Sequence, residues 1–398
     1  MKNLPKVLFA YPLFWMLSLV PIFWVIVLLV LVVQPKIQNE NSSSKLLIPI
    51  ILLPIASIPI GIYLEGNIPW SRIVSSTGYA IVWICVYKIY QGIGNGPDSK
   101  LVNSFLFLVS AQGMITLTAI FSPAVRYSLP VNSLDFLGST GYGFSGKYLY
   151  YTDWLDSTVS RSAGISGNPT WAGAVALGGL VLAFTVLARN TSGSRKLAKV
   201  AIPLTLLNVY LSQSRSLWIS LAIAAATSGY FIYRDKDKLT GFFITVILTI
   251  ISATFLILKY NSIIQVFIKV DQSRVGSRYA RADIYSATIE KIQEIQIPVL
   301  GYGFKPTNEL LVAAIGSHST YLGLLFRGGV LCLLAYLLFV LSLSKSAISA
   351  NSPISIFAII FIGLWSILED VDAGHFALIL FLLIYRIGLQ QKTLKKRL

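Results

Sequence analysis

The chain has 398 residues, of which 55% are hydrophobic and only 12% are charged, and its mean hydropathy is +0.72. A water-soluble globular domain carries about 25% charged residues, so this composition excludes one and predicts an integral membrane protein. The formal net charge of +16 agrees with basic loops that contact anionic lipid. No nucleic-acid-binding motif accompanies that charge, so we expect membrane lipids, and no nucleic acid, among the partners.

Apolar stretches of about 20 residues, the length with which an α-helix crosses the hydrocarbon, recur along the chain. Their continuous hydrophobicity excludes the alternating strands of a membrane β-barrel. The predicted fold class is therefore all-α, a polytopic bundle of about eleven or twelve transmembrane helices with two long external loops. The first stretch contains Pro12 and Pro21 and is either one kinked helix or a tight hairpin. The expected spans are 6–33, 46–64, 73–92, 101–121, 169–188, 197–213, 216–233, 239–258, 319–344, 353–368 and 374–390.

The short loops predict how the bundle is oriented. Lysine and arginine are dense in residues 188–199 and 233–238 and in the tail 391–398, which the positive-inside rule assigns to the cytoplasm. Counting helices from these loops makes two long loops and the acidic turn 368–375 external. The expected organisation is N-terminal helices (1–121), an external loop (122–168), central helices (169–258), a large external loop with an amphipathic helix (259–317), and C-terminal helices with a basic tail (318–398).

Two motifs are set aside before the informative ones. Cys85 and Cys332 lie inside predicted spans, where a thiol is a small packing group, and neither belongs to a CxxC pattern. The segment GYGFSGK (141–147) has the spacing of a phosphate-binding loop. Tyr148 follows it, however, where such loops need Ser or Thr, and no strand and helix flank it. We therefore predict no metal site and no cofactor.

The large external loop combines arginines with a helical apolar pattern. Isoleucines at helical spacing predict an amphipathic helix lying on the bundle or at the membrane interface. Arginine binds phosphate through two parallel hydrogen bonds and keeps its charge in a low-dielectric site. The alternative is a basic patch that holds lipid headgroups. The arginines are Arg274, Arg278 and Arg281, and the isoleucines are Ile284, Ile289, Ile292 and Ile295.

Two further residues share the predicted external face with these arginines. Arg215 stands in a very short turn between apolar spans, where a charge is costly unless it is solvated, snorkelling or paired. His318 opens another span, with Ser317 or Ser319 available as an ordinary helix cap. Together with the loop arginines, they predict a cationic cavity open to the outside.

Three more side chains are weaker candidates for this cavity. Arg327 is a secondary binding candidate, because the adjacent glycines at 328 and 329 are expected to break the helix and turn Arg327 towards the cavity. Arg161, in the first long loop, is another secondary candidate. His375 is expected to pair with Asp370 or Asp372 at the outer surface.

Four short motifs in one order resemble the O-antigen ligase and O-antigen polymerase superfamily. They are a Ser-Arg turn before a span, an Arg followed four residues on by an aromatic residue, a Pro-x-x-Gly-x-Gly, and a His-Ser that opens a helix with a glycine break. The resemblance covers about residues 160–345. The matching residues are Ser214 and Arg215; Arg281 and Tyr285, where many members have Trp; Pro298, Gly301 and Gly303; and His318 with Gly328 and Gly329.

The resemblance implies a metal-independent glycosyltransferase in the cell inner (cytoplasmic) membrane, with its active site facing the periplasm or exterior. A glycan on a polyprenyl diphosphate donor would pass to an acceptor hydroxyl. By the same resemblance, Arg215 and Arg281 would hold the diphosphate and His318 would act as general base. Arg278 is close enough to Arg281 to be the phosphate ligand instead.

The resemblance leaves several alternatives open. A ligase transfers the glycan to lipid A core, whereas a polymerase of O-antigen, capsule or exopolysaccharide transfers it to a growing glycan. A transporter of lipid-linked sugars would also need a cationic cavity, but its usual internal repeat is not visible in the sequence. A metal-dependent transferase would place acidic residues in the first external loop, where only Glu65 stands.

Overall fold

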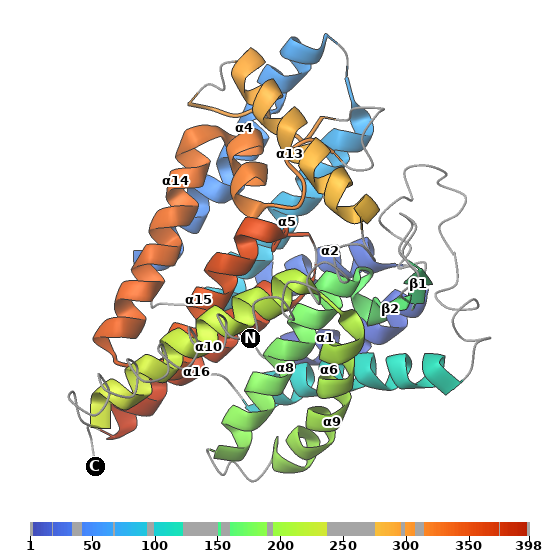
Figure 1. Ribbon diagram of the computed structural model, residues 1–398. Coiled ribbons are helices and arrows are strands. Elements are labelled where there is room, and N and C mark those ends of the chain that lie inside the picture. Colours follow the sequence, from blue (N-terminus) through green and yellow to red (C-terminus); the bar gives the residue numbers. More distant parts are fainter. Residues whose placement is uncertain are drawn as a thin grey trace, which may run out of the picture.

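The fold is seen in a computed structural model that describes residues 3–17, 19–33, 42–66, 68–93, 99–121, 150–152, 160–188, 194–236, 275–295, 299–306, 314–373 and 375–395. Within these ranges the protein is all-α, apart from one short antiparallel strand pair and a 3₁₀ turn (Figure 1). The elements are α1 (Leu4–Met16), α2 (Val20–Val32), α3 (Ser42–Lys45), α4 (Leu47–Glu65), α5 (Trp70–Gly92), α6 (Ser99–Phe121), β1 (Tyr150–Thr152), β2 (Ser160–Ser162), η2 (Gly164–Ser166), α8 (Pro169–Ala188), α9 (Arg195–Ser212), α10 (Arg215–Lys236), α13 (Val275–Ile295), α14 (Thr320–Ser349), α15 (Pro353–Leu368) and α16 (Ala377–Lys395).

The helices confirm a polytopic membrane protein. Five helices among the described residues are long and apolar enough to cross a membrane. Shorter apolar helices accompany them at the two ends of the chain. The predicted spans match helices one for one, except for 6–33, which forms two, and 239–258, which lies outside the described residues. The total of eleven or twelve crossings therefore stays a prediction.

The first apolar stretch folds back on itself. α1 and α2 have 13 residues each, so each is about 20 Å long and too short to cross the hydrocarbon alone. The rings of Tyr11 and Phe23 meet edge to face with centroids 4.8 Å apart, whereas a continuous helix would separate them by about 18 Å. α1 ends before Leu17. In a continuous helix, a proline at position 21 would clash with the carbonyl of Leu17, four residues earlier. The structure therefore adopts the tight hairpin and not the single kinked helix.

Small residues let α8 pack closely inside the bundle. A Cβ at Gly173 would meet the Ser212 hydroxyl of α9, and one at Gly179 would meet Val109 of α6. A Cβ at Gly178 would meet Leu380 of α16. Helices in a membrane associate through such close approaches, because lipid provides little hydrophobic force between them.

A glycine breaks α14, as expected from the sequence. Gly329 has φ 73° and ψ −170°, a conformation that favours glycine. The segment 301–304 runs beside the break, and its amides replace the missing helical donors. Tyr302 N donates to the Phe326 carbonyl at 2.6 Å, and Gly303 N donates to the Arg327 carbonyl at 2.8 Å. The break therefore leaves these two carbonyls satisfied, as a buried backbone requires.

A helix, α13, lies over the segment predicted to be an amphipathic helix, but one isoleucine expected on its apolar face is exposed. Ile284 is buried and Ile292 packs on a small cluster that includes Phe304, whereas Ile289 is 51% exposed. Thr288 is fully buried in its place. Residues four apart share a helix face, so Ile284 aligns with Thr288 and leaves Ile289 about 140° away. The side chain of Ile295 lies outside the described residues.

Candidate functional site

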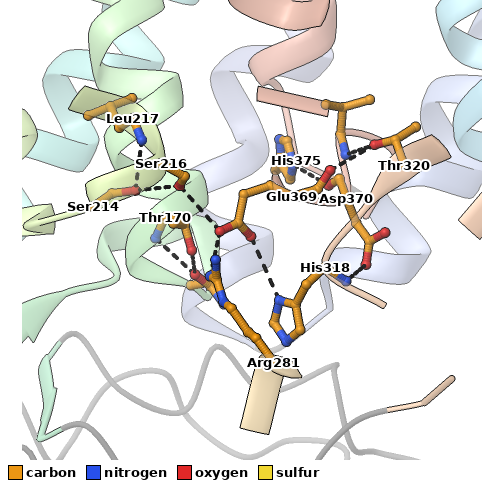
Figure 2. A network of polar contacts seen from close by, with 12 residues as sticks. Thr170, Ser214, Ser216, Leu217, Arg281, His318, Thr320, Glu369, Asp370 and His375 are labelled. Carbon is orange, nitrogen blue, oxygen red and sulfur yellow. Dashed lines mark hydrogen bonds and ion pairs between the residues drawn. The ribbon is translucent and has the colours of Figure 1, made fainter. Parts of the chain in front are cut away.

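A buried carboxylate gathers polar side chains from three separate parts of the chain. Glu369 follows α15 directly and is 2% exposed. Its Oε1 accepts from Arg281 Nη2 of α13 at 2.7 Å and from Ser216 Oγ of α10 at 3.3 Å. Its Oε2 faces His318 Nδ1 at 3.9 Å. Figure 2 shows Arg281 and His318 reaching this carboxylate from neighbouring directions.

The charge of Glu369 depends on these neighbours. Burial by itself raises the pKa of a carboxylic acid, but the Arg281 guanidinium and the His318 imidazole act in the opposite direction. Their combined effect holds the pKa of Glu369 below its ordinary value. The group is therefore a buried carboxylate anion at neutral pH, with Arg281 as its main counter-ion.

His318 sits in a strained backbone conformation that two side chains hold. Its φ is 63°, in the left-handed region that residues other than glycine seldom adopt. The His318 N–H donates to Asp370 Oδ2 at 3.2 Å, and the His318 carbonyl accepts from the Tyr285 hydroxyl at 2.9 Å. Ser319 caps α14 by accepting from Leu322 N at 3.4 Å. His318 therefore stands just before the helix, with its imidazole about one-third exposed.

Some of the predicted arginines lie at or near this site, and others lie outside the described residues. Arg281 lies in the site, and Arg215 is the residue before Ser216, which contacts Glu369. Arg161, on β2, donates from Nε to the Ser212 carbonyl at 3.0 Å, at the turn that leads to Arg215. These three therefore lie at the same end of the bundle as His318. Arg274 and the side chain of Arg278 lie outside the described residues.

A comparison with known families matches the part of the chain that carries three of the predicted site residues. Residues 200–337 match a protein-family model described as O-antigen ligase. The match covers about a third of the chain and supports its resemblance to the O-antigen ligase and polymerase superfamily. The matched residues include Arg215, Arg281, His318 and the glycine break in α14, whereas Glu369 follows them. No curated protein matches the chain. This match supports a membrane enzyme that processes lipid-linked glycans together with a glycan acceptor.

One secondary candidate is engaged elsewhere. Arg327 is 1% exposed, and its guanidinium pairs with the buried carboxylate of Asp372. The same guanidinium lies 3.9 Å from the centre of the Tyr79 ring, and Trp83 Nε1 donates to Asp372 Oδ2 at 3.0 Å. The expectation that the helix break turns Arg327 towards an open cavity is therefore wrong, because the break turns it into a buried ion pair.

The expected pairing of His375 is also wrong. His375 is buried between Trp171 and Trp365, with ring centroids 5.1 and 5.4 Å away. Its Nε2 contacts the backbone carbonyl of Asp370, whose carboxylate is instead held by Lys305 Nζ at 2.9 Å. Burial lowers the pKa of His375 to about 4, so its imidazole is neutral at physiological pH.

The acidic turn is the part of the site that sequence reasoning missed. Glu369, Asp370 and Asp372 are all buried, and each has a cationic partner: Arg281, Lys305 and Arg327 respectively. A signal was present in the sequence, because three carboxylates directly after an apolar span are costly in a membrane unless they are paired. Within the described part of the chain, no group of His, Cys, Asp and Glu side chains is arranged to hold a metal ion.

Proposed function

We propose that this protein transfers a glycan from a polyprenyl diphosphate carrier to an acceptor hydroxyl at the outer face of the cytoplasmic membrane. This is the ligase-like reaction of the superfamily. The supporting observation is that Arg281 and His318, 37 positions apart, meet at one buried carboxylate beside the start of α10, where Arg215 stands. The site thus combines cationic groups with a base at a single end of the bundle.

The arginines suit a diphosphate leaving group. Negative charge builds on the diphosphate as its bond to the sugar breaks, and a fixed guanidinium stabilises that charge without reorganising. Glu369 anchors Arg281 from the buried side, while the Arg281 side chain keeps about one-third of its surface exposed. In this proposal the exposed side of Arg281 and the guanidinium of Arg215 bind the diphosphate through paired hydrogen bonds. No metal ion is needed for this role.

His318 is the proposed general base. Its Nδ1 faces Glu369, which leaves Nε2 for the acceptor hydroxyl. Nε2 takes the hydroxyl proton as the hydroxyl oxygen bonds to the anomeric carbon. The bond from that carbon to the diphosphate oxygen breaks, and its electron pair leaves with the carrier. The Glu369 carboxylate then stabilises the imidazolium that forms. General-base catalysis of this kind contributes about 10² to 10⁴ in rate.

The acceptor separates the two enzymes of the superfamily. A ligase would use a hydroxyl of lipid A core, and a polymerase would use the glycan of a second carrier-linked unit. Both reactions use the same donor and the same three side chains, so the polymerase reaction is the alternative to the ligase reaction that we propose.

A reconstituted transfer assay tests the proposal. Purified protein in detergent receives a polyprenyl-diphosphate-linked glycan and either lipid A core or carrier-linked acceptor, with EDTA and without nucleotide, and products are resolved on a gel. We expect transfer by the wild type and no transfer by His318→Ala or Arg215→Ala. Arg195→Ala is the matched control, because Arg195 is exposed at the opposite end of α9 from the Arg215 turn.

Each outcome has a distinct meaning. Product on lipid A core supports the ligase reaction, and a ladder of lengthened glycan supports the polymerase reaction. Full activity in His318→Ala would contradict the proposed base. Donor binding by the wild type without any transfer would contradict the enzyme and favour the transporter of lipid-linked sugars.

A further inference from the structure

A cationic side chain of α16 lies at the end of the bundle opposite to Glu369. Two residues after Arg386, Gly388 packs against Ser352 and Ser355 at the start of α15. Ser355 Oγ also donates to the Tyr385 carbonyl at 2.7 Å. Arg386 is therefore level with the turn between α14 and α15, whereas Glu369 follows the far end of α15. The basic tail comes next in the chain, so the positive-inside rule assigns this end to the cytoplasm.

The Arg386 guanidinium is held against an aromatic ring. It lies 4.3 Å from the centroid of Tyr90, near the end of α5. Tyr90 is fully buried and meets the Phe339 ring of α14 edge to face at 5.8 Å. Helices α5 and α14 thus fix the surface on which the guanidinium rests. Because a guanidinium is planar and stacks well, its donors keep one orientation.

Two donor atoms of this guanidinium have no hydrogen-bond partner among the described residues. They are Nε and Nη2, which are buried within a side chain that is half-buried as a whole. Among the described residues, no carboxylate forms an ion pair with Arg386. The buried arginine at the other end of the bundle, Arg327, pairs with Asp372. Buried charged donors are expensive without an acceptor, and an ionisable group at membrane depth is a functional candidate by default.

The position of Arg386 near the membrane surface and the geometry of its donor atoms both fit a phosphate group as the acceptor. Nε and one terminal nitrogen of a guanidinium form the paired donor set that fits two oxygens of a phosphate. At the cytoplasmic ends of the helices, the phosphates available in quantity are those of lipid headgroups. Lys45 of α3 is exposed at the same end and adds positive potential, which favours anionic lipid.

We propose that Arg386, stacked on Tyr90, binds the headgroup phosphate of an anionic phospholipid in the cytoplasmic leaflet. This lipid site is separate from the transfer site around Glu369 and does not depend on the proposed function. It would hold the C-terminal half of α16 against α5 and α14.

Lipid retention by the full-length protein tests this site. Delipidated protein in detergent is titrated with phosphatidylglycerol, phosphatidylcholine or inorganic phosphate, and bound lipid is counted by native mass spectrometry. We expect the wild type to retain phosphatidylglycerol about tenfold more strongly than Arg386→Met, the effect of losing one charge-assisted contact pair. Lys345→Met is the matched control, because it removes one exposed positive charge at the same end and should retain lipid like the wild type.

Variants of the ring check the geometry independently. Tyr90→Phe keeps the stacking surface and should retain lipid, whereas Tyr90→Leu removes it and should lose retention. Equal retention by the wild type and by an Arg386→Met protein that remains folded would overturn the proposal. An equal loss in Lys345→Met would also overturn it, because diffuse charge would then explain binding. If inorganic phosphate protected the protein against thermal unfolding as well as phosphatidylglycerol does, the site would be one for free anions and the lipid assignment would be overturned.

Discussion

The buried pair of Arg327 and Asp372 offers the sharpest test of the structure, because the sequence suggests a different role for Arg327. The pair is almost fully enclosed, at 1% and 0% side-chain exposure. Arg327→Met would leave the Asp372 carboxylate buried, with the Trp83 indole as its remaining hydrogen-bond donor among the described residues. Leaving one partner of a buried ion pair uncompensated costs about 3–5 kcal/mol. We expect a loss of stability of that size.

The double variant makes the reasoning specific to the pair. Arg327→Met combined with Asp372→Asn leaves no uncompensated charge, so we expect it to be more stable than Arg327→Met alone. The interaction energy of the cycle should lie towards the upper end of the roughly 0.5–3 kcal/mol found for contacting residues. Unfolding is followed by tryptophan fluorescence in one detergent, with transfer activity measured in parallel. Lys345→Met, on the exposed side of the same helix, should change stability by less than about 0.5 kcal/mol.

Either of two results would refute this reasoning. If Arg327→Met were as stable as the wild type but inactive, then Arg327 would be a substrate ligand, as the sequence alone suggests. Equal instability of the single and double variants would show that the two charges do not depend on each other.

Two further predictions concern the surroundings of His318. Tyr285→Phe removes the donor to the His318 carbonyl, and we expect transfer to slow by about fivefold, equivalent to about 1 kcal/mol for one hydrogen bond. Tyr321→Phe, whose hydroxyl binds Gly363, is the control, and an unchanged rate in Tyr285→Phe would rule out this holding role. Burial lowers the pKa of His375 to about 4, below the ordinary value of about 6.5. The free energy of unfolding should therefore be highest above about pH 6.5 and fall by up to about 3 kcal/mol as the pH drops towards 4. His375→Gln should remove that part of the pH dependence, which unfolding at several pH values measures; an unaltered slope would contradict it.

The sequence by itself determined the class of protein and most of the helices. Hydrophobic runs of membrane length can satisfy their backbone in lipid only as helices, so α4, α5, α6, α8 and α14 follow from composition and length. The order of short motifs also predicts that Arg215, Arg281 and His318 belong to one site. Local patterns of this kind need no knowledge of which helices are neighbours.

Tertiary structure alone decided which charges meet. Arg327 and Arg281 look alike in the sequence, yet one is enclosed by Asp372 and Tyr79 and the other remains partly exposed beside His318. Glu369 became the centre of the site only because α10, α13 and the start of α14 converge on the end of α15. Pairing between residues far apart in the chain depends on helix packing, and the energy of each charge depends on its burial, so neither can be read from a linear pattern.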